Sequence, residues 1–156
     1  DPCDIILMGQ EILGSCQRLD GSAELNIGLL GPLLDGKYRL IVIKDETGKL
    51  VARCLLKILW DEKKSVPVLF QERFYINAAS NDAHAQLLNE MCIRKAKKMN
   101  LALVKSQEYS SEAPAYNNPM VSLGGRSAFE YVDAIGSVQG NRYEIPAGTV
   151  IWQPEA

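Results

Sequence analysis

Histidine is almost absent from this sequence, and the cysteines are never close together. The single histidine is His84, and no two of the four cysteines form a C-x-x-C pair. Zinc sites of the finger type need four grouped Cys or His ligands, so the sequence predicts no metal site. With 156 residues the chain can bury a core without disulfide support. We therefore expect free thiols in the cytoplasm or another reducing intracellular compartment.

Positive charge is not in excess either. The 17 lysines and arginines stand against 19 acidic residues, which gives a formal net charge of -2. Nucleic-acid-binding domains carry a clustered basic excess, so we predict no nucleic-acid partner. No apolar run approaches the ~20 residues of a membrane-spanning helix, so we predict no membrane contact. The chain begins with Asp1 and has no signal segment, which we interpret as a single domain excised from a larger protein.

What the sequence does contain is a clear strand pattern in its first half. Residues 38–44 are apolar and β-branched, residues 45–48 (Asp-Glu-Thr-Gly) are typical of a turn, and residues 49–60 alternate as a second strand. One face of this second strand is wholly apolar, whereas the other carries Arg53 and Lys57. We therefore expect an antiparallel hairpin whose mixed face meets solvent.

A strand, a helix and a further strand are expected next. Residues 66–75 alternate as a strand, and an apolar stripe at helical spacing follows, with basic residues in its last turns. Ser80 or Asn81 can cap this helix, and Asn100 ends it. Residues 101–104 form a short apolar strand, which we expect to lie parallel to the strand before the helix.

The domain divides into four segments. Residues 1–35 have no clear pattern, residues 36–105 form an α/β core, residues 106–127 are a long loop, and residues 128–156 hold short strands, the last of them an edge strand at 149–152. The predicted fold class is α/β (α+β). Its mixed, mostly antiparallel sheet contains a long hairpin, a central strand–helix–strand unit and a C-terminal β region.

The order of elements over residues 38–104 resembles the core of the Gcn5-related N-acetyltransferases. The resemblance rests on the hairpin that turns at residues 45–48, the strand 66–75, and the helix that ends in Lys-Lys-Met-Asn before the strand 101–104. It implies an acetyltransferase-like fold. It also implies one alternative function, a divergent acyl-CoA-dependent N-acyltransferase with acetyl-CoA as cofactor.

The loop before the helix departs from the pattern of that family. Members carry Gln/Arg-x-x-Gly-x-Gly/Ala there, and its backbone N–H groups hold the pyrophosphate of the coenzyme. Residues 77–83 of this chain contain no glycine, and Asp82 stands where the phosphate would lie. We therefore expect no cofactor. In the acyltransferase alternative, the backbone of residues 80–83 would hold acetyl-CoA.

Glu72 is the candidate general base of the acyltransferase alternative. Alternation places it between Phe70 and Phe74 on one strand face, and such an apolar setting would tune its carboxyl group for taking a proton from a substrate amine. The competing interpretation, which we favour, is a salt bridge from Glu72 to Arg53 or Arg73 on a solvated sheet face.

Cys16 and His84 form a second candidate site. Cys16 lies in the small-residue sequence Gly-Ser-Cys-Gln, which resembles the surroundings of a nucleophilic cysteine, and His84 would take its proton. This pair would make the chain a cysteine-dependent hydrolase or transferase. The interpretation that we favour is a buried free cysteine and a solvated histidine in the first turn of its helix.

These observations favour a non-catalytic, acetyltransferase-like module of a larger protein, which binds a protein partner. The loop 106–127, or an exposed edge of the sheet through strand addition, would be its binding surface. The missing glycine loop supports this function. The Gly-Ser-Cys-Gln sequence and the single histidine keep the cysteine enzyme as an alternative.

Overall fold

The structure is a computed structural model of the whole chain, and it describes residues 1–21, 29–77, 81–106, 113–123 and 136–155. The described helices are α1 (Cys3–Leu7), α3 (Leu30–Leu34) and α4 (Asn81–Met99). The described strands are β1 (Tyr38–Lys44), β2 (Leu50–Asp61), β3 (Val66–Gln71), β4 (Tyr75–Ile76), β5 (Leu103–Ser106), β6 (Ala115–Tyr116), β7 (Met120–Val121), β8 (Ser137–Gln139), β9 (Arg142–Ile145) and β10 (Gly148–Trp152). None of these helices is both long and apolar enough to cross a bilayer.

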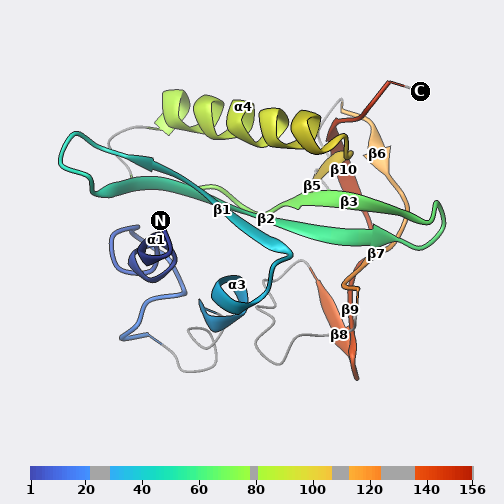
Figure 1. Cartoon of the computed structure of the whole chain (residues 1–156), viewed down its shortest axis with the longest axis horizontal. Coiled ribbons are helices and arrows are strands. Elements are labelled where there is room, and N and C mark those ends of the chain that lie inside the picture. The colour runs from blue at the N-terminus through green and yellow to red at the C-terminus, as the bar shows by residue number, and fades with distance from the viewer. Residues whose placement is uncertain (22–28, 78–80, 107–112, 124–135, 156) are drawn as a thin grey trace.

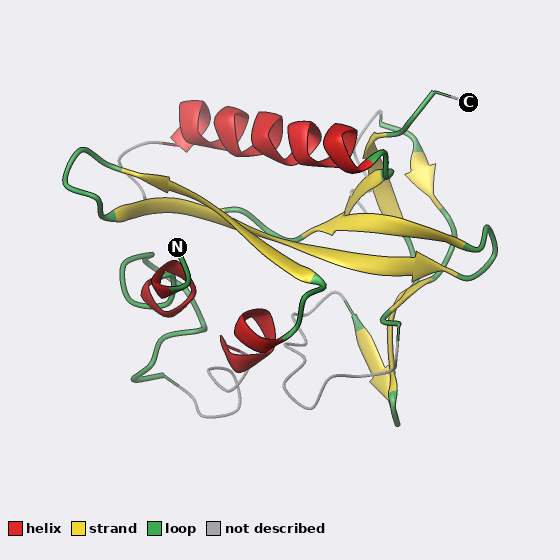
Figure 2. Cartoon of the chain, viewed as in Figure 1, coloured by secondary structure: helices red, strands yellow, loops and turns green. Residues whose placement is uncertain are grey.

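The described strands form one mixed sheet (Figure 2). Their order is β6-β10-β5-β3-β2-β7-β9-β8, and β1 and β4 also pair with β2. The pairing of β3 with β5 is parallel, because α4 carries the chain back to the same end of the sheet. The other described pairings are antiparallel. The predicted fold class, with a mixed and mostly antiparallel sheet, is confirmed.

The predicted hairpin is formed by β1 and β2, which pair antiparallel along the whole of β1. Its turn is held by Asp45, whose Oδ1 accepts hydrogen bonds from the backbone N–H groups of Thr47 (2.9 Å) and Lys49 (3.0 Å). Gly48 has a φ of 86°, a conformation that costs a residue with a side chain about 1 kcal/mol or more. The turn residues therefore fix the register of the hairpin locally.

The predicted helix is α4, and Asn100 ends it as expected. Asn100 has a φ of 54°, and the backbone N–H of Leu101 donates to the carbonyl oxygen of Ala96 at 3.1 Å. A left-handed residue after the last turn is a common way to satisfy helix-end carbonyl groups. The strand that follows is also confirmed, but β5 begins at Leu103, two residues later than predicted.

The C-terminal part of the sheet differs from the sequence prediction. The strand expected at an edge, residues 149–152, is β10, and it lies between β5 and β6. The strand β6 covers the outer side of β10 and comes from within the predicted loop 106–127, as does β7. A Cβ atom at Gly148 would lie 2.3 Å from a methyl carbon of Val104, so the close approach to β5 needs a glycine. Residues 128–135, the first part of the predicted C-terminal β region, lie outside the described residues.

Two layers cover the two faces of the central strands (Figure 1). The helix α4 packs on one face, which we call the α4 face. Its core includes Ala52, Cys54, Leu56, Leu88, Cys92 and Ala96. The segment with α1 and α3 packs on the opposite face, which we call the N-terminal face. Its core includes Met8, Ile12, Leu29, Leu50 and Leu55.

The described part of residues 1–35 is therefore an ordered layer, although the sequence showed no clear pattern there. Long-range hydrogen bonds attach it to the sheet. Glu11 Oε2 accepts from the backbone N–H of Leu50 at 2.7 Å. Asn77 donates from Nδ2 to the carbonyl oxygen of Glu11 at 3.0 Å, and its Oδ1 accepts from the N–H of Leu13 at 2.8 Å. These contacts position the segment that carries Cys16 beside β2 and β4.

Candidate functional site

A bulge between β3 and β4 decides which side chains meet on the N-terminal face. Gln71 is paired with Leu56, and Tyr75 is paired with Arg53. The β3–β4 strand therefore uses one residue more than β2 between these two pairs. An extra residue of this kind bends the strand and moves the following side chains to the other face.

The bulge corrects the expected surroundings of Glu72. Alternation placed Glu72 and Phe74 on one face, but Phe74 packs in the core of the α4 face. Tyr75 instead lies with Glu72 on the N-terminal face, where it packs against the core of that face. Glu72 is therefore not flanked by two phenylalanines on one face.

Lys57 and Glu72 form a buried ion pair on this face. Lys57 Nζ lies 2.8 Å from Glu72 Oε1, and the side chains are 1% and 6% exposed. Lys57 Nζ also donates to the hydroxyl oxygen of Tyr143 on β9 at 3.3 Å. It lies 5.5 Å from the ring centre of Tyr38 and 4.7 Å from that of Tyr143. Aromatic rings at these distances stabilise an ammonium group.

Two expectations are wrong here. The mixed face of β2 does not meet solvent, because the N-terminal segment and β9 cover it. The ion-pair partner of Glu72 is Lys57, and it is neither Arg53 nor Arg73. The role of Glu72 as a general base stays a prediction.

Arg53 is buried beside this ion pair. It is 2% exposed, and its Nη2 donates to Ser15 Oγ at 3.0 Å. The guanidinium carbon lies 4.1 Å from the ring centre of Tyr75, so the two groups stack. The Nε atom of Arg53 is buried without a hydrogen-bond partner. Burial lowers the pKa of Arg53, because the charged guanidinium has lost its hydration.

Cys16 and His84 lie on opposite sides of the sheet. Cys16 Sγ is 3.9 Å from the hydroxyl oxygen of Tyr75, on the N-terminal face. His84 is in the first turn of α4, which covers the other face (Figure 1). No contact between described residues joins the two side chains. A catalytic role for either residue stays a prediction. Cys16 and His84 are each half-buried, and His84 Nδ1 is buried without a hydrogen-bond partner.

The proposed coenzyme loop is only partly described. Residues 78–80 lie outside the described residues, whereas Asp82 is exposed in the first turn of α4. Its carboxylate therefore adds negative charge at the helix end that would face a pyrophosphate. Among the described residues, no group of three or more His, Cys, Asp or Glu side chains is arranged to hold a metal ion. All four cysteines are free.

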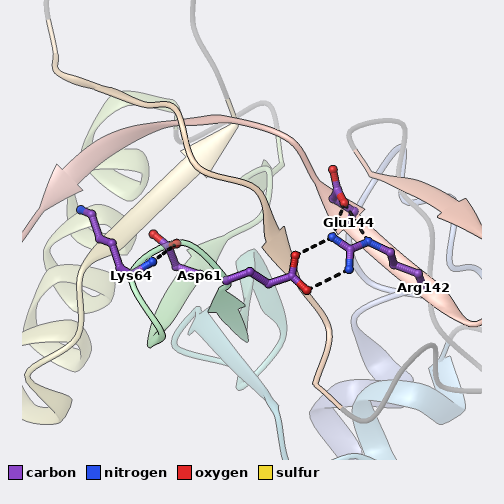
Figure 3. Close-up of polar contacts among 5 residues, drawn as sticks. Asp61, Lys64, Arg142 and Glu144 are labelled. Atoms are coloured by element: carbon purple, nitrogen blue, oxygen red, sulfur yellow. Dashed lines mark hydrogen bonds and ion pairs between the residues drawn. The ribbon is translucent and has the colours of Figure 1, made fainter.

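A second polar cluster lies at the other end of β2 (Figure 3). Asp61 is buried, and its Oδ2 accepts hydrogen bonds from the hydroxyl of Tyr116 and from Asn118 Nδ2, the latter at 2.8 Å. Its Oδ1 accepts from the backbone N–H of Lys64 at 2.9 Å. Burial and the bond to Asp61 raise the pKa of Tyr116. This cluster ties the β2–β3 turn to the segment 115–118.

Exposed ion pairs join the same turn to β9. Arg142 donates from Nη1 and Nη2 to the two carboxylate oxygens of Glu62, at 2.9 and 2.7 Å. It also donates to Glu144, its neighbour on the same strand face (Figure 3). Because these groups meet solvent, we assign them to the attachment of the C-terminal hairpin and not to a binding site.

Sequence reasoning missed the main members of the N-terminal face. The available signal was the pair of cations at Arg53 and Lys57 within an otherwise apolar strand, since isolated charges in such a strand are often buried with partners. Nothing in the local sequence connects Ser15 or Tyr143 to this strand, because both are brought there by tertiary packing.

Comparisons with known proteins define the fold. No family model and no curated protein matches the chain. Among solved structures, the chain is similar to a ribosomal-protein-alanine N-acetyltransferase from Brucella melitensis biovar Abortus 2308, with a TM-score of 0.54 and 16% identity over 71% of this chain and 79% of that one. This similarity confirms an acetyltransferase-like fold, and at this identity it shows the fold alone.

Two further solved structures match more weakly. A protein described as histone acetyltransferase HPA2 and related acetyltransferase, from Corynebacterium glutamicum, has a TM-score of 0.46 and 15% identity over 100% of this chain and 83% of that one. The BH1408 protein from Bacillus halodurans has a TM-score of 0.43 and 13% identity, and the match covers 51% of this chain and 55% of that one.

Proposed function

We propose that this chain is a non-catalytic module with an acetyltransferase-like fold, which works by binding a protein partner. The observation that carries the proposal is the ion pair of Glu72 with Lys57. A general base must come within ~3 Å of the proton that it takes, directly or through one water molecule. The Glu72 carboxylate is 6% exposed and already neutralised by an ammonium group at 2.8 Å.

The start of α4 supports the same proposal. A pyrophosphate needs free N–H groups and positive potential at a helix N-terminus. Asp82 supplies an exposed carboxylate in the first turn, and residues 77–83 contain no glycine that would let the backbone approach a phosphate closely. Acetyl-CoA should therefore bind weakly.

The outer edge of β1 is the proposed contact for the partner. Among the described strands, β1 pairs only with β2. Ile58 donates its backbone N–H to the carbonyl oxygen of Lys37 at 2.9 Å, so alternate residues from Lys37 onward bond to β2. The N–H and carbonyl groups of Leu40 and Val42 consequently point away from β2. They are available to an extended segment that adds to the sheet.

The surface next to this edge suits such a segment. An open cavity of about 530 Å³ lies between α1, α3 and β1, and its lining includes Leu40 and Val42. Leu33 and Leu34, which also line it, are 42% and 71% exposed. Apolar side chains beside a free strand edge allow a partner to gain both main-chain hydrogen bonds and side-chain burial. The proposed partner is therefore an extended, partly apolar peptide segment.

Two measurements test the non-catalytic part of the proposal. Isothermal titration with acetyl-CoA should give no binding heat at micromolar concentrations, and the chain should not hydrolyse the thioester. A micromolar dissociation constant, lost when Ala83 is changed to proline, would contradict the non-catalytic part.

The partner is tested by photo-crosslinking in cell extract from the protein's own source. A photoreactive residue at Val42 should give a defined protein adduct, and one at Lys63, in the exposed β2–β3 turn, should not. Adding Leu40→Pro should abolish the adduct, because it removes an outward N–H donor while the bonds of Ile41 to β2 remain. Leu40→Ala is the matched control. Equal adducts from both probe positions, or no effect of the proline, would reject strand addition.

A further inference from the structure

Arg53, Lys57 and Glu72 are buried on the N-terminal face, and together they carry one positive charge in excess. The buried carboxylate of α1, Asp4, is paired separately with Lys44 at 2.7 Å. Lys57 and Glu72 neutralise each other. Arg53 is 2% exposed, and it forms no ion pair with a carboxylate of the described residues. A buried charge without a counterion is unfavourable, so native structures pair such groups or bind an ion. The three side chains together leave one positive charge uncompensated.

We propose that Arg53 is the centre of a binding site for a small organic monocarboxylate. The planar guanidinium matches the two oxygens of a carboxylate, and its Nε atom is buried without a partner. Stacking on the Tyr75 ring fixes the plane of the guanidinium, which orients its donor edge. A monoanion cancels the single excess charge, whereas a phosphate dianion would leave a buried negative charge.

Neutral donors come from the turn that carries Ser15. The Ser15 hydroxyl oxygen accepts from Arg53 Nη2 at 3.0 Å and from the backbone N–H of Gln17 at 3.3 Å, which leaves its own hydrogen to be donated. Gln17 is 1% exposed, and both its amide nitrogen and its amide oxygen are buried without a hydrogen-bond partner. A buried amide without a protein partner is available to bind a polar ligand.

The turn that carries Ser15 and Gln17 packs closely against the chain that follows α1. A Cβ atom at Gly9 would lie 2.0 Å from the carbonyl oxygen of Gln17, so Gly9 allows the turn to pack directly on the chain after α1. Cys16 and Tyr75 are only half-buried, so they form the more exposed side of the site around Arg53. This site is independent of the function proposed above, since it involves neither the edge of β1 nor the coenzyme loop.

The test uses sodium formate, acetate and propionate as probes, with ionic strength held constant by sodium chloride. The melting temperature should rise saturably with at least one carboxylate, by about 3–6 °C at ten times its dissociation constant. Arg53→Met should remove this rise, because it keeps the length of the side chain and removes the charge. Arg39→Met is the matched control, because Arg39 is exposed and bonds to the carbonyl oxygens of Tyr38 and Gly36. It should keep the rise.

A second measurement does not depend on the folding of a variant. In the unaltered protein, the ¹⁵N resonance of Arg53 Nε should shift saturably on titration with the same carboxylate, while that of Arg39 should not. The proposal is overturned if no carboxylate gives a saturable change in either measurement, or if the rise persists in Arg53→Met. A larger effect from inorganic phosphate or from chloride than from any carboxylate would also reject the monocarboxylate.

Discussion

Lys57 Nζ and Glu72 Oε1 lie 2.8 Å apart in the interior of the protein, between the central strands and the N-terminal segment. The pair joins β2 to the residue that follows β3, and Tyr143 connects it to β9. This face of the sheet carries charged residues, but it lies in the interior of the protein and not at its surface. The stability of the Lys57–Glu72 pair depends on both partners, because each ion has been removed from water.

Loss of one partner of this pair should destabilise the fold strongly. Lys57→Ala should lower the free energy of unfolding by about 3–5 kcal/mol, since Glu72 would stay buried without a counterion. Lys63→Ala, in an exposed turn, should change it by less than about 0.5 kcal/mol. Urea denaturation measures both. A loss below about 1 kcal/mol for Lys57→Ala would mean that solvent reaches this face.

Removing both charges together should cost less than removing one. In Lys57→Met with Glu72→Leu, no buried ion remains, and apolar side chains fill most of the space. We expect this double variant to recover most of the stability that Lys57→Met alone loses, measured by the same denaturation. Additive losses would show that the two side chains act independently.

The α4 face should behave as an ordinary apolar core. Leu56 is 0% exposed and packs in the cluster with α4, so Leu56→Ala should cost about 2–5 kcal/mol through lost burial and a cavity. Leu34→Ala removes the same atoms from a side chain that is 71% exposed, and it should cost far less. Similar denaturation midpoints for the two variants would contradict this assignment.

Asp61 should contribute stability that acid removes. Burial alone would raise its pKa, but hydrogen bonds from Tyr116, Asn118 and the backbone N–H groups of Lys64 and Lys63 together lower it. A carboxyl group whose pKa is lower in the folded state stabilises the fold above its unfolded pKa of about 3.9, and this contribution is lost as the pH falls through the folded value.

The test of this pH dependence is Asp61→Asn. At pH 7 it should lose about 1–3 kcal/mol, because charged hydrogen bonds are replaced by neutral ones. The difference from the unaltered protein should shrink below about pH 4, as the native carboxylate takes up a proton. Glu46→Gln, in the exposed β1–β2 turn, is the control and should differ little at either pH. A difference that grows in acid would reverse the assigned direction.

Alkylation should show that Cys16 and His84 act independently. The sheet separates the two residues, so His84→Ala should leave the rate of iodoacetamide labelling at Cys16 within about twofold across pH 6–9. Cys54 and Cys92 are 0% exposed and should label only on unfolding, which provides internal references. Peptide mass mapping separates the sites. Labelling at pH 6 that is fast and falls severalfold in His84→Ala would restore the cysteine-enzyme alternative.

The sequence by itself determined the local elements. The β1–β2 hairpin follows from alternation and from a turn with Asp45 and Gly48, and α4 follows from its apolar stripe and from Asn100. Each of these features depends on residues close together in the chain, so backbone preferences and periodicity are sufficient. The parallel β5 follows from the same local logic, because a helix between two adjacent strands returns the chain to the same direction.

The tertiary structure alone decided the chemistry of the N-terminal face. One extra residue before Tyr75 moves Phe74 into the α4 core and leaves Glu72 opposite it, and no local pattern specifies such a bulge. The burial of Arg53 depends on Ser15, which is 38 positions earlier in the chain, and the burial of Lys57 depends on Tyr143, which is 86 positions later. Periodicity predicts which residues share a face of a strand, whereas contacts over such separations decide whether that face meets water.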